Sequence, residues 1–183
     1  MPNYRRPYIP GGTYFITQVT YKRVPWLCRD VGRQALRDAI ITVKKSYPFS
    51  IDAIVLLPEH LHCLLTLPPD DADFSIRLKL IKIYVTRYYG SALNINRVVS
   101  QSRHKRGERN LWQRRYWEHW IRNERDFATH CDYIHYNPVR HGLCKAPQDW
   151  LFSSVHRFIA EGIYPSDWRQ DKSPEIPHDD WDK

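Results

Sequence analysis

The sequence predicts an α+β fold of the ferredoxin-like type, a βαββαβ antiparallel sheet with helices on one face and a C-terminal helical extension. Two strand-like runs, 50–57 and 60–67, are separated only by Pro58 and Glu59, which indicates a hairpin. Helical periodicity precedes and follows this pair, and a further strand-like segment lies beyond each helix. The chain of 183 residues fits one domain, which we place at residues 1–164.

Two periodicities alternate over the first part of the chain. Residues 13–20 follow a Gly11-Gly12 turn and alternate apolar with polar side chains, which predicts a strand. Residues 31–47 predict a helix, with Asp30 as its cap and Pro48 as its end. The apolar residues at helical spacing within it are Ala35, Leu36, Ala39, Ile40 and Val43.

A second helix and a further strand are predicted after the hairpin. Asp73 or Ser75 is expected to begin the helix, and Gly90 to end it. Its predicted apolar stripe comprises Ile76, Leu80, Ile83 and Tyr84. After a basic loop, residues 111–121 are rich in Trp and Tyr and are predicted to form a fourth or edge strand.

The last long helix is predicted over residues 124–136. Its apolar residues at one-face spacing are Phe127, Cys131 and Ile134. Asn137-Pro138 is expected to end it, because a residue before proline is biased away from the α conformation. Residues 165–183 are predicted to be a loosely held acidic tail that contains prolines.

Composition excludes several classes of protein. The chain is 42% hydrophobic and 26% charged, which is ordinary for a globular domain and argues against disorder. No apolar run approaches the roughly 18 residues of a membrane-spanning helix. No signal-peptide pattern follows Met1, so we expect a cytoplasmic protein without a membrane partner. The cysteines Cys28, Cys63, Cys131 and Cys144 form no C-x-x-C pair and are predicted to be free thiols.

The charge balance indicates a polyanionic partner, since the net charge is +8 and the pI is about 9.4. Residues 97–125 hold nine Lys or Arg against three Glu, and Trp112, Tyr116 and Trp117 lie among them with faces for base stacking. The candidate nucleic-acid contacts are Arg5, Arg6, Arg103, Lys105, Arg106, Arg109, Arg114 and Arg115, and the last six are expected to form an arc near the final long helix. The alternative is a basic solvated surface over an aromatic core.

The motif His60-Leu61-His62 is the most specific local indication of a metal-binding or catalytic site. On a strand, residues two apart point to the same face, so both imidazoles can converge on one metal ion while Leu61 points the other way. The rest of the strand is very apolar, and two buried imidazoles on one face need a shared polar partner. The alternative is a pair of core histidines.

A second pattern lies in the final long helix. Tyr133 and Asn137 are four residues apart, so a phenol and a carboxamide face the same way. One helix can therefore offer a nucleophile together with a metal ligand. The alternative makes Tyr133 and Tyr136 helix aromatics that pack on the sheet, with Asn137 as the helix terminator.

Together these motifs resemble the REP-associated tyrosine transposases, which are relatives of the single-tyrosine HUH transposases of small insertion sequences. The segments that carry the resemblance are Pro58-Glu59-His60-Leu61-His62, Tyr133-x-x-x-Asn137-Pro138-Val139-Arg140-His141-Gly142, Tyr4-Arg5-Arg6, Gly11-Gly12-Thr13-Tyr14-Phe15 and Trp150-x-x-Ser153-Ser154-x-His156. The resemblance extends over nearly the whole chain, to about Trp168.

The resemblance implies a metal-dependent enzyme that cleaves and joins single-stranded DNA through a 5′-phosphotyrosine. It implies that His60, His62 and Asn137 hold the metal and that Tyr133 is the nucleophile, with Tyr136 as a rival. The broader insertion-sequence relatives have Gln where this chain has Asn137. The implied substrate is a hairpin from a short palindromic repeat with an adjacent unpaired tetranucleotide, read partly by residues of the N-terminal segment. Those residues are Gly11, Gly12, Thr13 and Tyr14.

The expected cofactor is Mg²⁺ or Mn²⁺, because two histidines and an amide oxygen suit either ion and Mn²⁺ is the better match to imidazole. Two other classes of protein stay open. One is a DNA hairpin-binding protein without catalysis, and the other is a zinc-dependent hydrolase that uses His60 and His62. The sequence leaves monomer and homodimer open, and a DNA substrate would make the protein nucleoid-associated.

Overall fold

The computed structural model describes residues 8–95, 99, 101–105 and 109–169. Its centre is a four-stranded antiparallel sheet in the order β2-β3-β1-β4. The strands are β1 (Thr13–Val19), β2 (Ser50–Leu56), β3 (His60–Thr66) and β4 (Trp117–Trp120). β1 and β2 lie on either side of β3 and run antiparallel to it, which is the split βαβ arrangement. The predicted fold class is confirmed.

Three long helices and several short ones connect the strands. The long helices are α1 (Asp30–Ser46), α2 (Phe74–Tyr84) and α4 (Glu124–Arg140). The short elements are η1 (Tyr21–Arg23), the π turn η2 (Val85–Tyr89), α3 (Gln101–His104), η3 (Pro147–Asp149) and α5 (Val155–Ala160). Asp73 caps α2, since its carboxylate accepts the N–H of Ile76 at 3.0 Å. Within the described part of the chain, no helix has both the length and the apolar character to cross a membrane.

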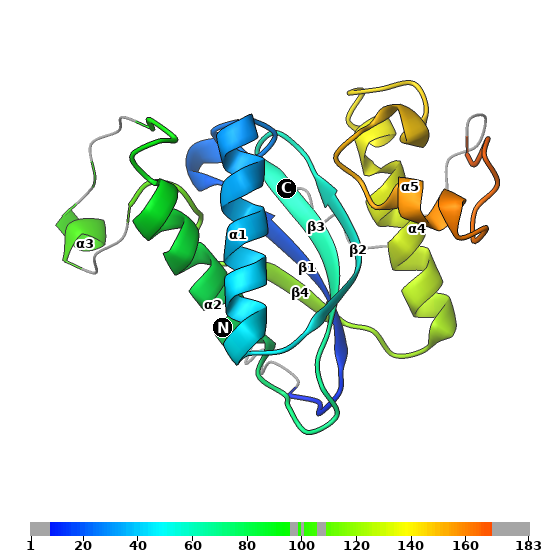
Figure 1. The fold of residues 1–183 in the computed structure, drawn as a ribbon, viewed down its shortest axis with the longest axis horizontal. Helices are drawn as coiled ribbons and strands as arrows, with labels where there is room; N and C mark the ends of the chain where they lie inside the picture. The colour runs from blue at the N-terminus through cyan, green and yellow to red at the C-terminus, as the bar shows by residue number, and fades with distance from the viewer. Residues whose placement is uncertain (1–7, 96–98, 100, 106–108, 170–183) are drawn as a thin grey trace, which may run out of the picture.

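Helices cover both faces of the sheet, which corrects the prediction that they lie on one face. α1 and α2 pack on the side of Tyr14 and Leu61, whereas α4 and α5 pack on the side of Phe15 and Leu64 (Figure 1). The physical reason lies in β3, which is buried at six of its seven positions. A strand with apolar side chains on both faces needs cover on both.

The predicted stripe of α2 is confirmed only in part, because Leu80 and Tyr84 pack against the core whereas Ile83 is 48% exposed. The most buried apolar residues of the helix are Phe74, Leu78 and Ile81, which lie outside the predicted stripe. The ring of Phe74 stacks on Tyr14 at a centroid distance of 4.1 Å. This contact between distant parts of the chain sets the rotation of the helix, because the helix is apolar on several sides and its own periodicity does not select one.

α4 continues one turn past its predicted end. Pro138 lies inside the helix, which runs to Arg140. Gly142 then ends it with a φ of +68°, a conformation that favours glycine. Proline biases the preceding residue against the helical conformation without forbidding it, and here both Asn137 and Pro138 are buried. Asn137 therefore stays on the same helical face as Tyr133.

β4 is shorter than the predicted strand over 111–121. Four residues pair with β1 as a strand, and Trp112 makes only an isolated bridge to Thr20. Between them, the carbonyl of Gln113 accepts a hydrogen bond from Lys82 Nζ of α2 at 2.6 Å. Because this carbonyl accepts a hydrogen bond from α2, it does not pair with β1, and the strand is interrupted at this residue.

The C-terminal motif around Trp150 and Ser154 extends the sheet at the edge of β2. The Ser154 backbone N–H donates to the carbonyl of Ile54 at 2.8 Å, and Ser154 Oγ accepts the Ile54 N–H at 2.8 Å. The indole N–H of Trp150 donates to the carbonyl of Leu56 at 2.8 Å. These bonds cover an edge that would otherwise present unpaired backbone groups.

Residues 165–169 pack on α4, although the tail is predicted to begin at residue 165. Trp168 stacks on Tyr164 at 4.1 Å, and Arg169 Nη2 lies 3.2 Å from Asp132 Oδ2. The remainder of the predicted tail, 170–183, lies outside the described residues. The packed part of the chain therefore extends at least to Arg169.

All four cysteines are free thiols, as predicted. Cys63 lies in the core between β3 and the layer of α1 and α2. Burial raises the pKa of its thiol to about 12, so it stays protonated and acts as a packing group.

We expect the stability of the fold to fall as the pH falls below neutral, because of His135 on α4. Burial lowers the pKa of His135 to about 3, and its ring nitrogens contact Ser154 Oγ at 2.8 Å and Tyr164 Oη at 3.2 Å. The unfolded chain protonates this group near pH 6.5, so it binds the extra proton between the two pKa values. Urea unfolding at pH 7 and pH 5 should show a loss of about 2 kcal/mol from this group.

The control for that experiment is His135→Gln, which removes the titrating ring and keeps a polar side chain. We expect this variant to lose less free energy of unfolding between the two pH values than the wild type. An equal loss in both proteins would contradict the role of His135.

Candidate functional site

β3 presents the two predicted histidines on the sheet face that α4 covers. His60 and His62 are both buried, and their ring centroids are 4.9 Å apart. His62 Nδ1 lies 2.8 Å from Thr17 Oγ1, and His60 Nδ1 lies 3.2 Å from Glu59 Oε1. Each ring therefore has Nδ1 held by an oxygen, which fixes its orientation and makes Nε2 the nitrogen that a metal ion would take. The sequence analysis missed both Thr17 and Glu59.

α4 and the residue that caps its C-terminus place three side chains along the histidine pair. The Tyr133 ring lies 5.3 Å from the His62 ring, and the ring of the cap residue His141 lies 5.2 Å from the His60 ring. Asn137 lies four residues after Tyr133 in α4 and four residues before His141, so it lies on the stripe that faces the two histidines. The structure thus brings together all four residues predicted for the metal and the nucleophile.

Asn137 is the member of this group whose side-chain polar atoms are left unsatisfied. It is 0% exposed, and neither its Oδ1 nor its Nδ2 has a hydrogen-bond partner among the described residues. A buried polar group left without a partner costs about 1–3 kcal/mol. Two imidazoles and an amide oxygen are a suitable donor set for a divalent cation, and the amide N–H groups suit a phosphate oxygen. The residues present therefore fit a metal ion that binds phosphate.

Tyr133 is held in place by contacts on several sides. It is 2% exposed, and its hydroxyl oxygen accepts a hydrogen bond from Arg140 Nη1 at 3.1 Å. The Arg140 guanidinium also lies 5.5 Å from the centre of the phenol ring. A cation that donates to a phenol oxygen stabilises the phenolate, the form that attacks phosphorus. The sequence did not identify Arg140 as a partner of Tyr133, although a spacing of seven residues places it two turns along the same face.

A second group of side chains can also hold a metal ion. His119, Asp126 and His130 offer ligand atoms that all lie within 4.8 Å of one another. However, His119 Nε2 lies 2.9 Å from Asp126 Oδ2, and His130 Nδ1 lies 3.0 Å from Asp126 Oδ1. Burial opposes ionisation of Asp126, but the hydrogen bonds from His119 and the Arg122 N–H lower its pKa overall. The Asp126 carboxylate of this group is thus already paired with both histidines, whereas the Asn137 amide has no hydrogen-bond partner among the described residues.

The predicted basic residues occupy several different environments. Lys105, Arg114 and Arg115 are exposed, while Arg5, Arg6 and Arg106 lie outside the described residues. Arg103 is 8% exposed, and its guanidinium donates to the carbonyl of Trp112 at 3.4 Å. It also lies 4.0 Å from the centre of the Tyr21 ring, so it positions this part of the chain.

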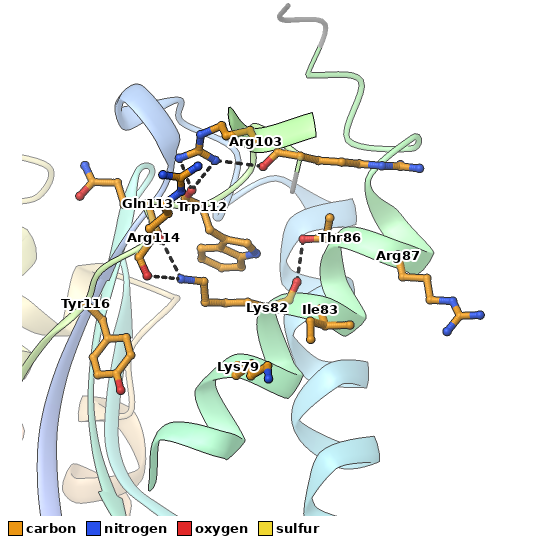
Figure 2. A pocket seen from close by; sticks show the side chains of 11 residues that line it. Lys79, Lys82, Ile83, Thr86, Arg87, Arg103, Trp112, Gln113, Arg114 and Tyr116 are labelled. Carbon is orange, nitrogen blue, oxygen red and sulfur yellow. Dashed lines mark hydrogen bonds between the residues drawn. The ribbon is translucent and has the colours of Figure 1, made fainter. Parts of the chain in front are cut away.

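The expected place of the basic arc beside the last long helix is corrected by the structure. Arg103, Arg109 and Arg114 line a cavity beside α2, which lies on the other face of the sheet (Figure 2). Residues 109–116 follow α2 rather than α4 because Trp112 is buried in the core with α1 and α2.

The Gly11 to Tyr14 segment forms a turn at the far end of β1 from the histidines. Thr13 pairs with Thr66, whereas Val19 at the other end pairs with His60. The Gly11 N–H donates to the carbonyl of Pro68 at 3.1 Å, with a φ of +67° at Gly11, and Gly12 is buried. Tyr14 is fully buried, and its hydroxyl accepts the Ile9 N–H at 2.9 Å. Tyr14 therefore has a core role.

Comparison with known proteins relates this domain to others along nearly its whole length. The family described as IS200-like transposase matches residues 10–137. A REP-associated tyrosine transposase from Escherichia coli K12 is 46% identical over 171 residues, which is 93% of each chain. A relative from Haemophilus influenzae is 41% identical over 168 residues, which is 92% of this chain and 93% of that one.

A solved structure shows the same relationship in three dimensions. The structure of a REP-associated tyrosine transposase bound to a REP hairpin has a TM-score of 0.75 and 43% identity, and the match covers 98% of this chain and 100% of that one. The fold and the family match define a transposase of the IS200-like class, whose members cut and join DNA. Within that class, the chain belongs to the REP-associated tyrosine transposases, as its motifs predict.

Proposed function

We propose that this transposase cleaves and rejoins single-stranded DNA beside short palindromic hairpins, through a covalent bond between Tyr133 and a 5′-phosphate. The observation that carries the proposal is the buried group in which Tyr133 meets His62 and Asn137 has no protein partner among the described residues. A phosphate and a cation complete this group, whereas a purely structural core would leave the Asn137 amide unsatisfied.

His60, His62 and Asn137 would hold a divalent ion, and Mg²⁺ or Mn²⁺ suits them best. When bound, such an ion neutralises charge on a nonbridging phosphate oxygen and orients the phosphate. Thr17 and Glu59 hold the two rings so that Nε2 of each is directed to that task. The requirement for a metal is general among transposases of this kind, and its identity here is part of the proposal.

Tyr133 Oη is the attacking atom in the proposed reaction. It forms a bond to phosphorus and loses its proton to solvent, while the bond from phosphorus to the 3′ oxygen breaks. The departing oxygen takes up a proton and becomes a free 3′-hydroxyl, and the 5′-phosphate stays on Tyr133. Arg140 supports this step because its guanidinium donates to the hydroxyl oxygen and favours the phenolate. The phosphotyrosine keeps a reactive ester, so a 3′-hydroxyl can reverse the step without ATP.

The proposed substrate is a hairpin of repeated palindromic DNA. The related transposase with a TM-score of 0.75 is bound to a REP hairpin, and the match covers nearly all of both chains. Lys105, Arg114 and Arg115 are exposed, so phosphates of the DNA can reach their side chains. An enzyme with this substrate acts on chromosomal DNA, which places it in the cytoplasm at the nucleoid.

A capture experiment with the wild-type protein tests the proposal. The protein is incubated with single-stranded hairpin DNA carrying unpaired flanks, in the presence of Mn²⁺ or of EDTA. We expect an SDS-resistant protein–DNA adduct with Mn²⁺ and none with EDTA, and mass spectrometry should place the DNA on Tyr133.

Two outcomes of this experiment would contradict the proposal. Tight hairpin binding without any adduct across a range of flanks would indicate a binding protein without catalysis. Cleaved DNA with no protein attached, together with tightly held zinc, would indicate a metal-dependent hydrolase. A parallel reaction with unstructured DNA of the same length controls for the hairpin requirement.

A further inference from the structure

His119, Asp126 and His130 form a compact group of metal-ligating side chains between β4 and α4. His119 lies in β4, whereas Asp126 and His130 lie one turn apart near the start of α4, which residues 121–123 connect to β4 (Figure 1). One ligand atom from each side chain lies within 4.8 Å of the other two. Among the described residues, this is the only group of three His, Cys, Asp or Glu side chains that is so close.

The distances within this group approach those of a tetrahedral zinc site. His119 Nε2 lies 2.9 Å from Asp126 Oδ2, and His130 Nδ1 lies 3.0 Å from Asp126 Oδ1. Ligands bound at about 2.1 Å to a tetrahedral ion lie about 3.4 Å apart, so both pairs are near the required spacing. The two imidazoles stack at 4.8 Å and must turn toward one another around an ion. The His119 side chain is 22% exposed, so its ring can make this rotation.

Asp126 and His130 are in the chemical forms that bind a cation at neutral pH. Burial acts to raise the pKa of Asp126, but hydrogen bonds from His119 and from the Arg122 N–H lower it overall, so the carboxyl group is ionised. Burial lowers the pKa of His130, so its ring is neutral. The Arg122 N–H donates to Asp126 Oδ2 at 3.0 Å and orients the carboxylate, as residues behind metal ligands commonly do.

Two imidazoles and one carboxylate favour Zn²⁺ over Mg²⁺ and Mn²⁺. Nitrogen ligands bind zinc more tightly than manganese, and the carboxylate supplies a negative charge that His60, His62 and Asn137 do not. Zinc sites with two histidines and one carboxylate keep a fourth position for water. The side chains of His119 and Asp126 are 22% and 20% exposed, so solvent can reach that position.

We propose that His119, Asp126 and His130 form a second metal site, which holds Zn²⁺ and fastens the start of α4 to β4. The ion positions the helix, and solvent completes its coordination. This inference does not rest on the proposed function, because no step of DNA cleavage involves the zinc ion.

His130 connects this site to the part of α4 that carries the proposed nucleophile. His130 and Tyr133 are three residues apart on the helix, and their rings lie 4.9 Å and 5.8 Å from the ring of Phe15. Asp126 belongs to the first turn, where its backbone N–H donates to the capping Asn123 Oδ1 at 2.9 Å. A zinc ion bound to Asp126 and His130 therefore holds the first two turns of α4 and limits the movement of Tyr133.

Counting bound zinc in a ligand variant tests the site. The protein is stripped with EDTA, equilibrated with buffered zinc in the low micromolar range and analysed for metal. We expect the wild type to retain one zinc ion more than His119→Gln, whatever the group of His60 and His62 retains. Glutamine can donate to Asp126 but supplies no imidazole, so zinc affinity should fall at least about 100-fold, more than for loss of a residue that only orients a ligand.

The matched control for zinc counting is His156→Gln. It makes the same change at an exposed histidine of α5, so it should retain as much zinc as the wild type. Equal zinc contents in the wild type and in His119→Gln would overturn the proposed site.

Hydrogen exchange tests whether the ion fastens α4 to β4. Zinc should slow the exchange of backbone amides over residues 127–134 at least about 10-fold in the wild type and should not slow it in His119→Gln. Saturating zinc should also raise the melting temperature of the wild type by about 5 °C more than that of the variant. Bound zinc that leaves exchange over these residues unchanged would overturn the fastening role.

A crystal of the wild-type protein grown with zinc keeps the proposal testable if His119→Gln fails to fold. Data collected at the zinc absorption edge should show an anomalous peak bonded to His119, Asp126 and His130. A peak at His60 and His62 without one at this group would overturn the proposal. Asp126→Asn, which removes the negative charge and keeps the shape of the side chain, should lose the peak.

Discussion

Tyr133→Phe should abolish the covalent adduct and lower strand cleavage by at least about 10³-fold, the scale expected for loss of a nucleophile. The change removes one oxygen, the acceptor of the Arg140 hydrogen bond. The ring that remains keeps its edge contacts with Phe15 at 5.8 Å and with His62 at 5.3 Å. We therefore expect the melting temperature to change by only a few degrees and the hairpin dissociation constant to stay within about 3-fold.

Tyr136→Phe is the matched control, because it removes the same atom from the next tyrosine of the same helix. Tyr136 is half-buried, and we expect Tyr136→Phe to form as much covalent adduct as the wild type does. If Tyr136→Phe loses the adduct while Tyr133→Phe keeps it, the nucleophile has been assigned to the wrong residue. If Tyr133→Phe loses hairpin binding, the hydroxyl contributes to DNA binding rather than to the cleavage step.

The hairpin, the first helix and the histidine strand could be predicted because local sequence determines them. Pro58 and Glu59 separate two apolar runs, so β2 and β3 pair across a short turn. Ala35, Leu36 and Ala39 recur at helical spacing, and α1 buries that face. In β3 the two-residue repeat places His60 and His62 on one side and Leu61 and Cys63 on the other. Leu61 and Cys63 belong to one core cluster, whereas the His62 ring stacks on Phe15 of the other.

The rotation of α2 and the layering of helices could not be predicted, because contacts between distant segments determine them. Tyr14 selects the side of α2 that carries Phe74, although the helix has apolar residues on other sides. Burial of β3 on both faces shows in its sequence as a run without alternation, from Cys63 to Leu65. The expectation of one open face came from the general behaviour of antiparallel sheets, which this run contradicts.

The site was predictable where spacing within one element creates it. Tyr133 and Asn137 share a face through the helical repeat, and the continuation of α4 past Pro138 preserves that face. Thr17 was not predictable, because it reaches His62 only through the β1–β3 register, 45 residues apart in sequence. The β1–β3 register follows from which strand faces are apolar. A prediction of the correct strand order would therefore have identified Thr17 as the partner of His62.

His60→Ala and His62→Ala should each lower cleavage by at least about 10³-fold while the hairpin dissociation constant changes by no more than about 3-fold. The two imidazoles are two of the three proposed donors, and in the proposed reaction cleavage depends on the ion that they would hold. Hairpin affinity comes mainly from phosphates on basic side chains, which neither substitution touches. Mn²⁺ binding, followed by calorimetry or by electron paramagnetic resonance, should weaken in both variants, and Asn137→Ala should weaken it less.

Because both rings are buried, a folding defect must be separated from loss of the metal. His62→Gln keeps a polar side chain beside Thr17 Oγ1 and removes the imidazole, so it should fold and still fail to cleave. His156→Ala changes an exposed histidine and should cleave normally. If none of the three variants folds, namely His60→Ala, His62→Ala and His62→Gln, the two histidines are structural residues of the core rather than metal ligands. If the folded variants bind Mn²⁺ with normal affinity, the metal binds at another group of side chains. The first such group to test is His119, Asp126 and His130.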